Sequence, residues 1–182
     1  MTPFYTAKGD SGDTGFLGEG RISKASVRIE AVGSVDEATA AIGLARALSS
    51  QDKTWSILLK VQKQLYFLMS ELSATPETAE HFDKINDEEL GWLETQIAEL
   101  EKVVTLPREF IIPGENLPSG ALSVARAVVR RAERRTVALL DADEIQKPIL
   151  AAYLNRLSSL LFILEVYEAS FSKEGIRLAK ED

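Results

Sequence analysis

Apolar residues recur at helical spacing along most of the chain. After Thr54 they share one helix face through Leu58, Leu65 and Leu72, and no glycine or proline interrupts the pattern until Pro76. Similar runs precede and follow this one. The pattern predicts helices at about 35–49, 53–74, 119–141 and 147–172, together with a third helix that begins at Asn86 or Asp87 and carries Leu90 to Leu100.

Residues at the predicted helix ends support these boundaries. Ser34 precedes Val35-Asp36-Glu37, which is typical of an N-cap followed by an acidic first turn. Pro148 falls in the first turn of the last helix, where proline is tolerated. No alternating run long enough for a strand and no internal repeat is visible, and the connections suit antiparallel neighbours. We therefore expect an all-α fold, a five-helix up-and-down bundle in a single domain over residues 1–182, with a glycine-rich N-terminal segment (1–34) before the bundle (35–182).

Composition excludes several classes of function. The chain has 182 residues, 45% of them hydrophobic, and a net charge of -7, so it repels the phosphate backbone of nucleic acids. It has no cysteine and a single histidine, His81, which excludes thiol nucleophiles, thiolate metal sites and a multi-histidine zinc site. The N-terminus shows no apolar leader, and no window reaches the roughly 18 uncharged apolar residues of a membrane span. We expect a soluble, cytoplasmic protein with no nucleic-acid or membrane partner.

Glycines gather in the first twenty residues, where no apolar periodicity is present. Small residues, hydroxyls and Lys8 could present backbone N–H groups to an anion, although the P-loop pattern is absent. Lys24 adds a second cation at the end of this segment. Both a functional loop and a mobile tail remain open on this evidence.

The fourth predicted helix carries an arginine stripe. Arg126, Arg130 and Arg134 span only about 80° of the helix circumference, apart from the arc of apolar residues that can face the core. Stacked guanidinium groups repel one another unless anions lie between them, as a polyphosphate or acidic partner residues would. A solvated basic face with pairs to Glu133 is the equally weighted alternative.

Several separate motifs are spread over nearly the whole chain. They are Tyr5-Thr6-x-x-Gly9-Asp10-x-Gly12-x-Thr14-Gly15, Ser23-Lys24, Gly33-Ser34-Val35-Asp36-Glu37, Phe110-Ile111-Ile112-Pro113-Gly114, Val124-Ala125-Arg126, Arg130-Arg131-Ala132-Glu133-Arg134 and Tyr153-Leu154-Asn155-Arg156-Leu157-Ser158. The apolar 110–112 run is unusual for a connection rich in proline, and Asn155 lies in a helix where a buried amide needs a hydrogen-bond partner. Together these motifs resemble one family, the PduO-type ATP:cob(I)alamin adenosyltransferases.

The resemblance implies a five-helix bundle that forms a homotrimer with ATP sites between subunits. It implies that Arg130 is the leading triphosphate contact, and that Asp36 and Arg126 form an inter-subunit ion pair that braces the corrinoid pocket. Phe110 would cover the lower face of the corrin and displace the axial base of cobalt. Magnesium would arrive with ATP, so its protein ligands stay unassigned. The residues that the resemblance assigns to ATP are Thr6, Ala7, Lys8, Gly9, Asp10, Gly12, Thr14, Gly15, Lys24, Arg130, Arg131, Glu133, Arg134 and Asn155.

The implied reaction transfers the 5′-deoxyadenosyl group of ATP to the Co(I) centre of a reduced corrinoid such as cob(I)alamin, forming adenosylcobalamin and releasing triphosphate. Because Co(I) is the nucleophile, no protein nucleophile is needed. A cobalamin-dependent acceptor enzyme would use the product. Two alternatives stay open: a non-catalytic paralogue that binds ATP or adenosylcobalamin as a sensor or carrier, and a structural bundle whose arginines pair with acidic partners.

Four positions depart from the pattern of the family. Lys8 and Thr39 stand where threonine and asparagine are common, Glu115 replaces a glycine, and Ser123 replaces a frequent histidine. We expect Glu115 to lie near the corrin, so these changes bear on corrinoid specificity more than on nucleotide binding.

Overall fold

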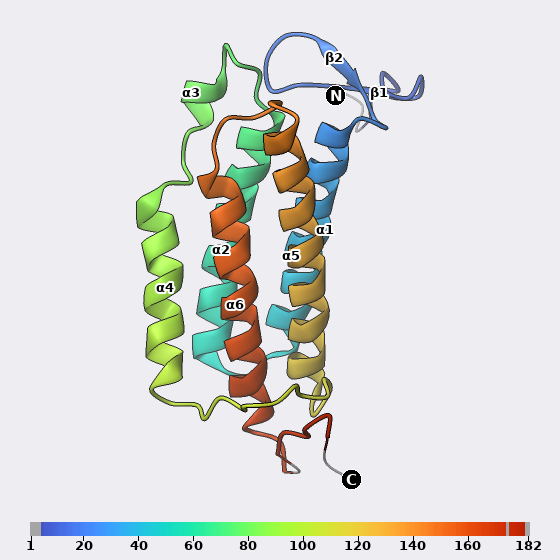
Figure 1. Ribbon diagram of the computed structural model, residues 1–182. Helices are drawn as coiled ribbons and strands as arrows, with labels where there is room; N and C mark the ends of the chain where they lie inside the picture. Colours follow the sequence, from blue (N-terminus) through green and yellow to red (C-terminus); the bar gives the residue numbers. More distant parts are fainter. Residues whose placement is uncertain (1–4, 174, 181–182) are drawn as a thin grey trace.

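A computed structural model describes residues 5–173 and 175–180 and shows an antiparallel helical bundle (Figure 1). Five long helices and one short helix follow an N-terminal pair of strands, which confirms the predicted five-helix bundle. The elements are β1 (Asp13–Gly15), β2 (Arg21–Ser23), α1 (Val27–Leu48), α2 (Asp52–Ser73), α3 (Ala79–Phe82), α4 (Asp87–Glu101), α5 (Leu117–Asp141) and α6 (Ile149–Ala169).

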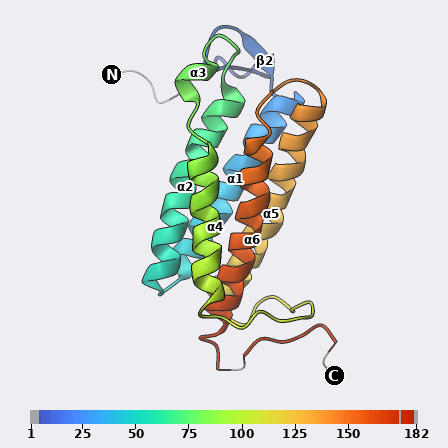
Figure 2. The ribbon, with the colours of Figure 1, turned by 60° about the vertical axis from the view of Figure 1, so that its left-hand side comes forward.

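Successive long helices run in opposite directions, as in an up-and-down bundle (Figures 1 and 2). Helix α5 packs against α1 and α6, α1 also packs against α2, and α4 covers the outer side of α6. Connections at one end of the bundle join α2 to α4 and α5 to α6, and the strand pair lies at this same end. The connection from α4 to α5 and the C-terminal segment lie at the opposite end (Figure 1).

Helix α6 is the central helix, because apolar side chains occupy all of its sides. Its length and mean hydropathy of 1.6 would suffice to cross a membrane, but 61% of that window is buried inside the bundle, which identifies a core helix. The fully buried Tyr153 donates a hydrogen bond from its hydroxyl to Gln64 Oε1 at 2.9 Å. Burial also raises the pKa of Tyr153, so the phenol stays neutral.

Helix α1 begins eight residues before the predicted position, at Val27. Ser26 is the true N-cap and accepts a hydrogen bond from the backbone N–H of Ile29. Ser34, predicted as the cap, is buried inside the helix and donates its hydroxyl to Glu30 O at 2.8 Å. The predicted division at residue 34 is therefore wrong, since residues 27–34 belong to the bundle.

The glycine-rich segment contains two strands that were not predicted. β1 and β2 pair antiparallel, with Thr14 opposite Ile22. Strands of three residues are too short to show an alternating pattern, which explains why periodicity missed them. We call residues 5–24 the N-terminal hairpin.

The other helix ends lie close to the predicted positions. Helix α5 starts two residues early, at Leu117, because Asn116 and Ser119 form a capping box and Pro118 fits the first turn. Helix α6 is shorter than predicted and leaves Lys147 and residues 170–172 outside it. The short helix α3 lies within the segment predicted as a connection.

Candidate functional site

Two basic side chains hold the N-terminal hairpin in shape. Lys24 donates from Nζ to Gly9 O at 2.6 Å, and Arg21 donates to Lys8 O at 2.6 Å. Arg21 also pairs with Asp13, with Nη2 and Oδ1 at 2.5 Å. The hydrogen bond from Arg21 and a second one from Ser11 hold the pKa of Asp13 well below its ordinary value. These contacts bring the predicted segment from Thr6 to Gly15 and Lys24 together in one structured unit.

The hairpin is tied to the bundle through its middle. Leu17 donates its N–H to Ser73 O at 2.9 Å, and its carbonyl accepts from Thr78 Oγ1. Gly18 approaches Thr75 so closely that a Cβ on Gly18 would lie 2.5 Å from Thr75 Oγ1. The N-terminal segment is therefore packed on the ends of α2 and α3, and the interpretation as a mobile tail does not hold for the described residues.

Arg28, at the start of α1, links three parts of this end of the bundle. It is 8% exposed, donates from Nη1 to Ala74 O at 3.1 Å and binds Glu144 in the connection between α5 and α6. Its guanidinium also lies over the ring of Phe16 in the hairpin. The position of the hairpin is thus set by a buried arginine that sequence analysis did not single out.

A cavity of about 630 Å³ lies beside these contacts, between the ends of α2 and α3 and the connection between α5 and α6. It is lined by Lys147 and by acidic side chains, and none of the predicted ATP-binding residues contributes to it. Lys147 binds Glu71 and Asp83. Burial opposes the charge of Lys147, but these hydrogen bonds outweigh it and raise its pKa. The cavity does not suit a polyphosphate, because its cations already have partners.

The arginines of α5 divide into paired and unpaired groups. Arg131 binds Glu37 of α1, and Arg135 lies 3.3 Å from Glu30. Arg130 and Arg134 are exposed, and their side chains form no ion pair or hydrogen bond with any other residue in the described parts of the chain. None of these arginines pairs with Glu133, so that part of the alternative interpretation is wrong.

Glu133 has a different partner from the one predicted. It accepts a hydrogen bond from Asn155 Nδ2 at 2.8 Å, which joins α5 to α6. Asn155 is exposed, so the expectation of a buried amide is wrong. The structure nevertheless brings together the five predicted ATP-binding residues that lie beyond the hairpin. They are Arg130, Arg131, Glu133, Arg134 and Asn155.

Arg126 lies on the same side of α5, nearer to its N-terminus. Its Nε is 3.8 Å from Glu165 Oε2 of α6, and its guanidinium lies over the ring of Phe162. Asp36 is exposed at the tenth position of α1, away from the helix start where it was predicted, and no ion pair involves it among the residues described. The predicted pair between Asp36 and Arg126 is not formed within one chain.

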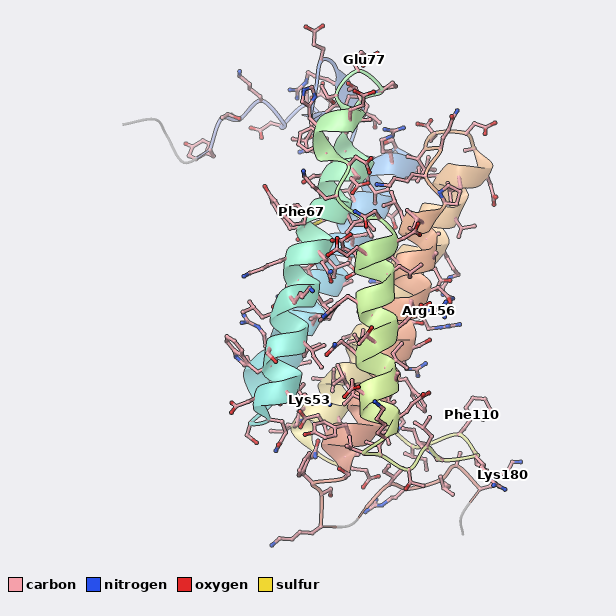
Figure 3. The ribbon with its side chains drawn as sticks, turned by 90° about the vertical axis from the view of Figure 1, so that its left-hand side faces the viewer. Lys53, Phe67, Glu77, Phe110, Arg156 and Lys180 are labelled. Carbon is pink, nitrogen blue, oxygen red and sulfur yellow. The ribbon has the colours of Figure 1, made fainter. Side chains whose placement is uncertain are left out.

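Phe110 is the most exposed large apolar side chain of the described residues, at 86%. Its backbone is fixed by the C-terminal segment, because Ala179 N–H donates to Phe110 O at 2.7 Å and Ile112 N–H donates to Arg177 O at 2.9 Å. Figure 3 shows Phe110 beside Lys180 at the end of the bundle opposite Glu77. This support from residues 177–179 was not predicted, since a short segment without apolar periodicity carries no signal.

The four departures from the family pattern lie in different environments. Glu115 is nearly buried, 3.8 Å from Arg177, so the expectation that it faces a corrin finds no support in one chain. Thr39 bonds back to Val35 O within α1, and Ser123 is buried in α5. Lys8 is exposed in the turn at residues 8–11, which precedes β1.

Within one chain the predicted residues occupy separate places. The hairpin lies at one end of the bundle and Phe110 at the other, and the arginine stripe runs between them along α5, which is roughly 36 Å long (Figures 1 and 3). One compact site that contains all of them cannot form from a single chain.

Comparisons with known proteins identify the family. A family model described as cobalamin adenosyltransferase matches residues 4–168. The corrinoid adenosyltransferase of Bacillus subtilis is 39% identical over 162 residues, covering 87% of this chain and 82% of the relative. The corrinoid adenosyltransferase of Mycobacterium tuberculosis is 39% identical over 173 residues, covering 90% and 87%.

Solved structures agree. A phenylalanine-to-histidine variant of the PduO-type ATP:corrinoid adenosyltransferase from Lactobacillus reuteri, complexed with cobalamin and ATP, superposes with a TM-score of 0.86 at 30% identity, covering 98% of this chain and 97% of that one. An arginine-to-lysine variant of the same enzyme, complexed with ATP, gives 0.85 at 29% identity, covering 97% and 100%. This helical bundle with its basic helix face belongs to the cobalamin adenosyltransferase family.

Proposed function

We propose that this protein transfers the 5′-deoxyadenosyl group of ATP to the Co(I) centre of a reduced corrinoid. The observation that carries the proposal is the pair of exposed arginines on α5, Arg130 and Arg134, which have no acidic partner in the described chain although their neighbours Arg131 and Arg135 do. Two unpaired guanidinium groups about one helical turn apart suit a bound polyphosphate. Family membership identifies that polyphosphate as ATP.

The reaction forms one bond and breaks one. The Co(I) electron pair of the substrate attacks the ribose C5′ of ATP, a Co–C bond forms, and the bond from C5′ to the triphosphate oxygen breaks. The leaving triphosphate takes that electron pair, so negative charge grows on it. Arg130 and Arg134 would neutralise this charge, and Lys24 would add a third cation from the hairpin. No side chain has to act as nucleophile or base.

The hairpin would hold the nucleotide, with Mg²⁺ carried by ATP. Lys24 donates one N–H to Gly9 O, which leaves two further donors on the ammonium for phosphate oxygens. Asn155 and Glu133 are already linked to each other and would present a fixed polar edge to the nucleotide. In this proposal the remaining contacts come from the segment between Thr6 and Gly15 and from Arg131.

Phe110 would bind the corrinoid. An aromatic side chain that stands 86% exposed on a fixed backbone is ready to lie against an apolar ring face, and covering it stabilises the complex. Against the lower face of a corrin, the ring would keep water and the axial base away from cobalt. The Lactobacillus reuteri enzyme has been solved with cobalamin and ATP in two variants in which a phenylalanine is replaced by histidine or by alanine.

The separation of these residues within one chain supports sites between subunits. We propose a homotrimer in which the hairpin of one subunit meets the arginine stripe of another, and Asp36 of one subunit pairs with Arg126 of its neighbour. Because ATP is a cytoplasmic nucleotide, we place the reaction in the cytoplasm. The adenosylcobalamin product would pass to a cobalamin-dependent enzyme.

The first test is an anaerobic assay with chemically reduced cob(I)alamin and Mg·ATP, following the loss of the Co(I) absorbance and identifying the alkylated product. The expected result is adenosylcobalamin from the wild type and a loss of about 10²- to 10³-fold in kcat for Arg130→Ala, because one charge-stabilising donor is gone. Arg135→Ala removes the same charge from the same helix and is expected to keep normal turnover. An ATP-induced thermal shift without any product would contradict the enzyme and indicate a binding paralogue.

A further inference from the structure

A buried carboxylate lies beneath Arg126 and lacks the hydrogen bonds that such a group normally has. Glu165 is 2% exposed, and among the described residues neither of its oxygens has a hydrogen-bond partner of ordinary geometry, although the Ser123 hydroxyl lies near the carboxylate. The nearest cation is Arg126, whose Nε is 3.8 Å away and also lacks a hydrogen bond there. Buried polar atoms in folded proteins are paired in the large majority of cases, so both groups need an explanation.

The surroundings make this pair an exception within α6. The other buried side chains of α6 are mostly leucine, isoleucine and valine, and an apolar residue at position 165 would cost less free energy than a carboxylate without hydrogen bonds. Burial raises the pKa of Glu165, while Ser123 and the charge of Arg126 oppose that change. A residue that lowers stability at its position is a candidate for a functional role.

The orientation of Arg126 indicates what that role is. Its Nε edge is buried toward Glu165, but the side chain as a whole is 34% exposed. Neither terminal nitrogen is buried, and neither has a hydrogen-bond partner in the parts of the chain that the structure describes. Phe162 lies against the guanidinium one turn before Glu165. Two residues of α6 thus contact the inner side of the guanidinium and leave its outer side free.

We propose that Glu165 is a positioning residue for Arg126. It holds the Nε edge of the guanidinium in its own subunit, so that the two terminal nitrogens face outward as a fork for the carboxylate of Asp36 in a neighbouring subunit. A planar guanidinium with one edge fixed has lost most of its rotational freedom before the subunits meet, which lowers the cost of forming the inter-subunit pair. This inference rests on the proposed function, because it assigns the outer side of Arg126 to the subunit interface that braces the corrinoid.

The kinetic test compares Glu165→Gln with Glu168→Gln. Glu168 is also 2% exposed on α6, but its carboxylate accepts a hydrogen bond from Ser49 Oγ and forms no ion pair with an arginine among the described residues. We expect Glu165→Gln to raise the KM for the corrinoid about tenfold while the KM for ATP stays unchanged. Glu168→Gln is expected to change neither constant.

A double-mutant cycle identifies the route of the effect. In an Arg126→Gln background, Glu165→Gln is expected to add no further rise in the corrinoid KM, because the residue through which it acts is gone. Equal effects of Glu165→Gln in both backgrounds, or a matching rise in the KM for ATP, would overturn the proposal. If Glu165→Gln fails to fold, Glu165→Asp serves instead, because it keeps the charge and withdraws it by one methylene.

A spectroscopic measurement separates this inference from the proposed reaction. In heteronuclear NMR of the intact protein, the Nε–H signal of Arg126, assigned by its loss in Arg126→Lys, is expected to be protected from solvent exchange in the wild type. It should shift and exchange faster in Glu165→Gln and stay in place in Glu168→Gln. An unchanged signal in Glu165→Gln refutes the positioning role even if the enzyme turns over, and a shifted signal supports it even if no adenosyl transfer is found.

Discussion

The two ends of the bundle differ in the side chains that they expose and in how those side chains are paired. At the hairpin end, polar side chains satisfy one another: Lys24 binds Gly9, Arg21 binds Asp13, and Arg28 ties the hairpin to the bundle. At the opposite end, Phe110 stands 86% exposed and Leu117 74% exposed. The first end holds its shape without a ligand, whereas the second presents apolar surface that becomes stable only when something covers it.

This difference matches the chemistry of the two substrates. A nucleotide triphosphate is bound by fixed N–H donors and cations, and their positions must be set before binding because water competes for each of them. A corrin offers a broad apolar face, and an exposed aromatic ring can bind it without a network of donors. The comparison predicts that changes at the exposed end affect one substrate, whereas changes at the hairpin end affect stability as well.

Among the substitutions that test this difference between the two ends, Phe110→Ala is expected to have the largest effect. Burial of one phenylalanine side chain stabilises a complex by about 1.5–3 kcal/mol, so kcat/KM for the corrinoid is expected to fall about 10- to 150-fold. The dissociation constant for ATP, measured by calorimetry, should stay near the wild-type value. Val103→Ala is the control, since Val103 is 62% exposed in the same connection. A weaker affinity for ATP in Phe110→Ala would show that the two ends are not independent.

Most of the bundle could be predicted from the sequence because its helices have long apolar faces. The error at the start of α1 has a clear origin: Gly33 and Ser34 resemble a helix boundary, but a Cβ at Gly33 would meet nothing within 4 Å and the Ser34 hydroxyl bonds back to Glu30. The residue types at these two positions are compatible both with a helix boundary and with the interior of a helix. Packing of residues 27–34 against the rest of the bundle decides between them.

The sequence predicted which residues belong to the candidate site, but it did not predict which side chains they pair with. Arginine spacing on α5 indicated an exposed basic stripe, yet the sequence could not say that Arg131 pairs with Glu37 while Arg130 stays unpaired, because those choices depend on α1. Arg28 and Glu165 were missed for the same reason. The two glutamates among the apolar residues of α6, Glu165 and Glu168, were a signal that could have identified Glu165.

The next effect, at the hairpin end, concerns stability. A Cβ at Gly18 would lie 2.5 Å from Thr75 Oγ1 and 2.8 Å from its Cγ2, so Gly18→Ala must displace the hairpin or Thr75. We expect a loss of about 1–3 kcal/mol in the free energy of unfolding, measured by chemical denaturation, together with weaker ATP binding. Gly15→Ala is the stability control, because a Cβ there meets nothing within 4 Å. Unchanged stability of Gly18→Ala would show that the hairpin is not held as described.

A smaller effect is expected at the exposed end from Ala179→Pro. Proline removes the N–H that donates to Phe110 O, and one such hydrogen bond contributes about 0.5–1.5 kcal/mol. We expect a rise in the corrinoid KM of up to about tenfold with the KM for ATP unchanged. Ala179→Ser keeps the N–H and should behave as the wild type. Equal kinetics in the proline and serine variants would mean that the C-terminal segment does not position Phe110.

The smallest effect concerns pH and the buried Glu165. Burial raises its pKa in the folded protein, so between the unfolded-state pKa and the raised value the folded state binds more protons than the unfolded state. Stability of the wild type therefore falls as pH rises through that window, and Glu165→Gln lacks this loss. The difference in unfolding free energy between Glu165→Gln and the wild type should therefore grow in favour of the variant as the pH rises above the ordinary glutamate pKa of 4.5. A tenfold difference in proton affinity between the folded and unfolded states corresponds to about 1.4 kcal/mol. Parallel pH profiles from chemical denaturation would contradict this expectation, and Glu168→Gln measures the contribution of a neighbouring buried carboxylate. A variant that gains stability while it loses affinity for the corrinoid would identify the unpaired carboxylate as a feature retained for binding at the expense of the fold.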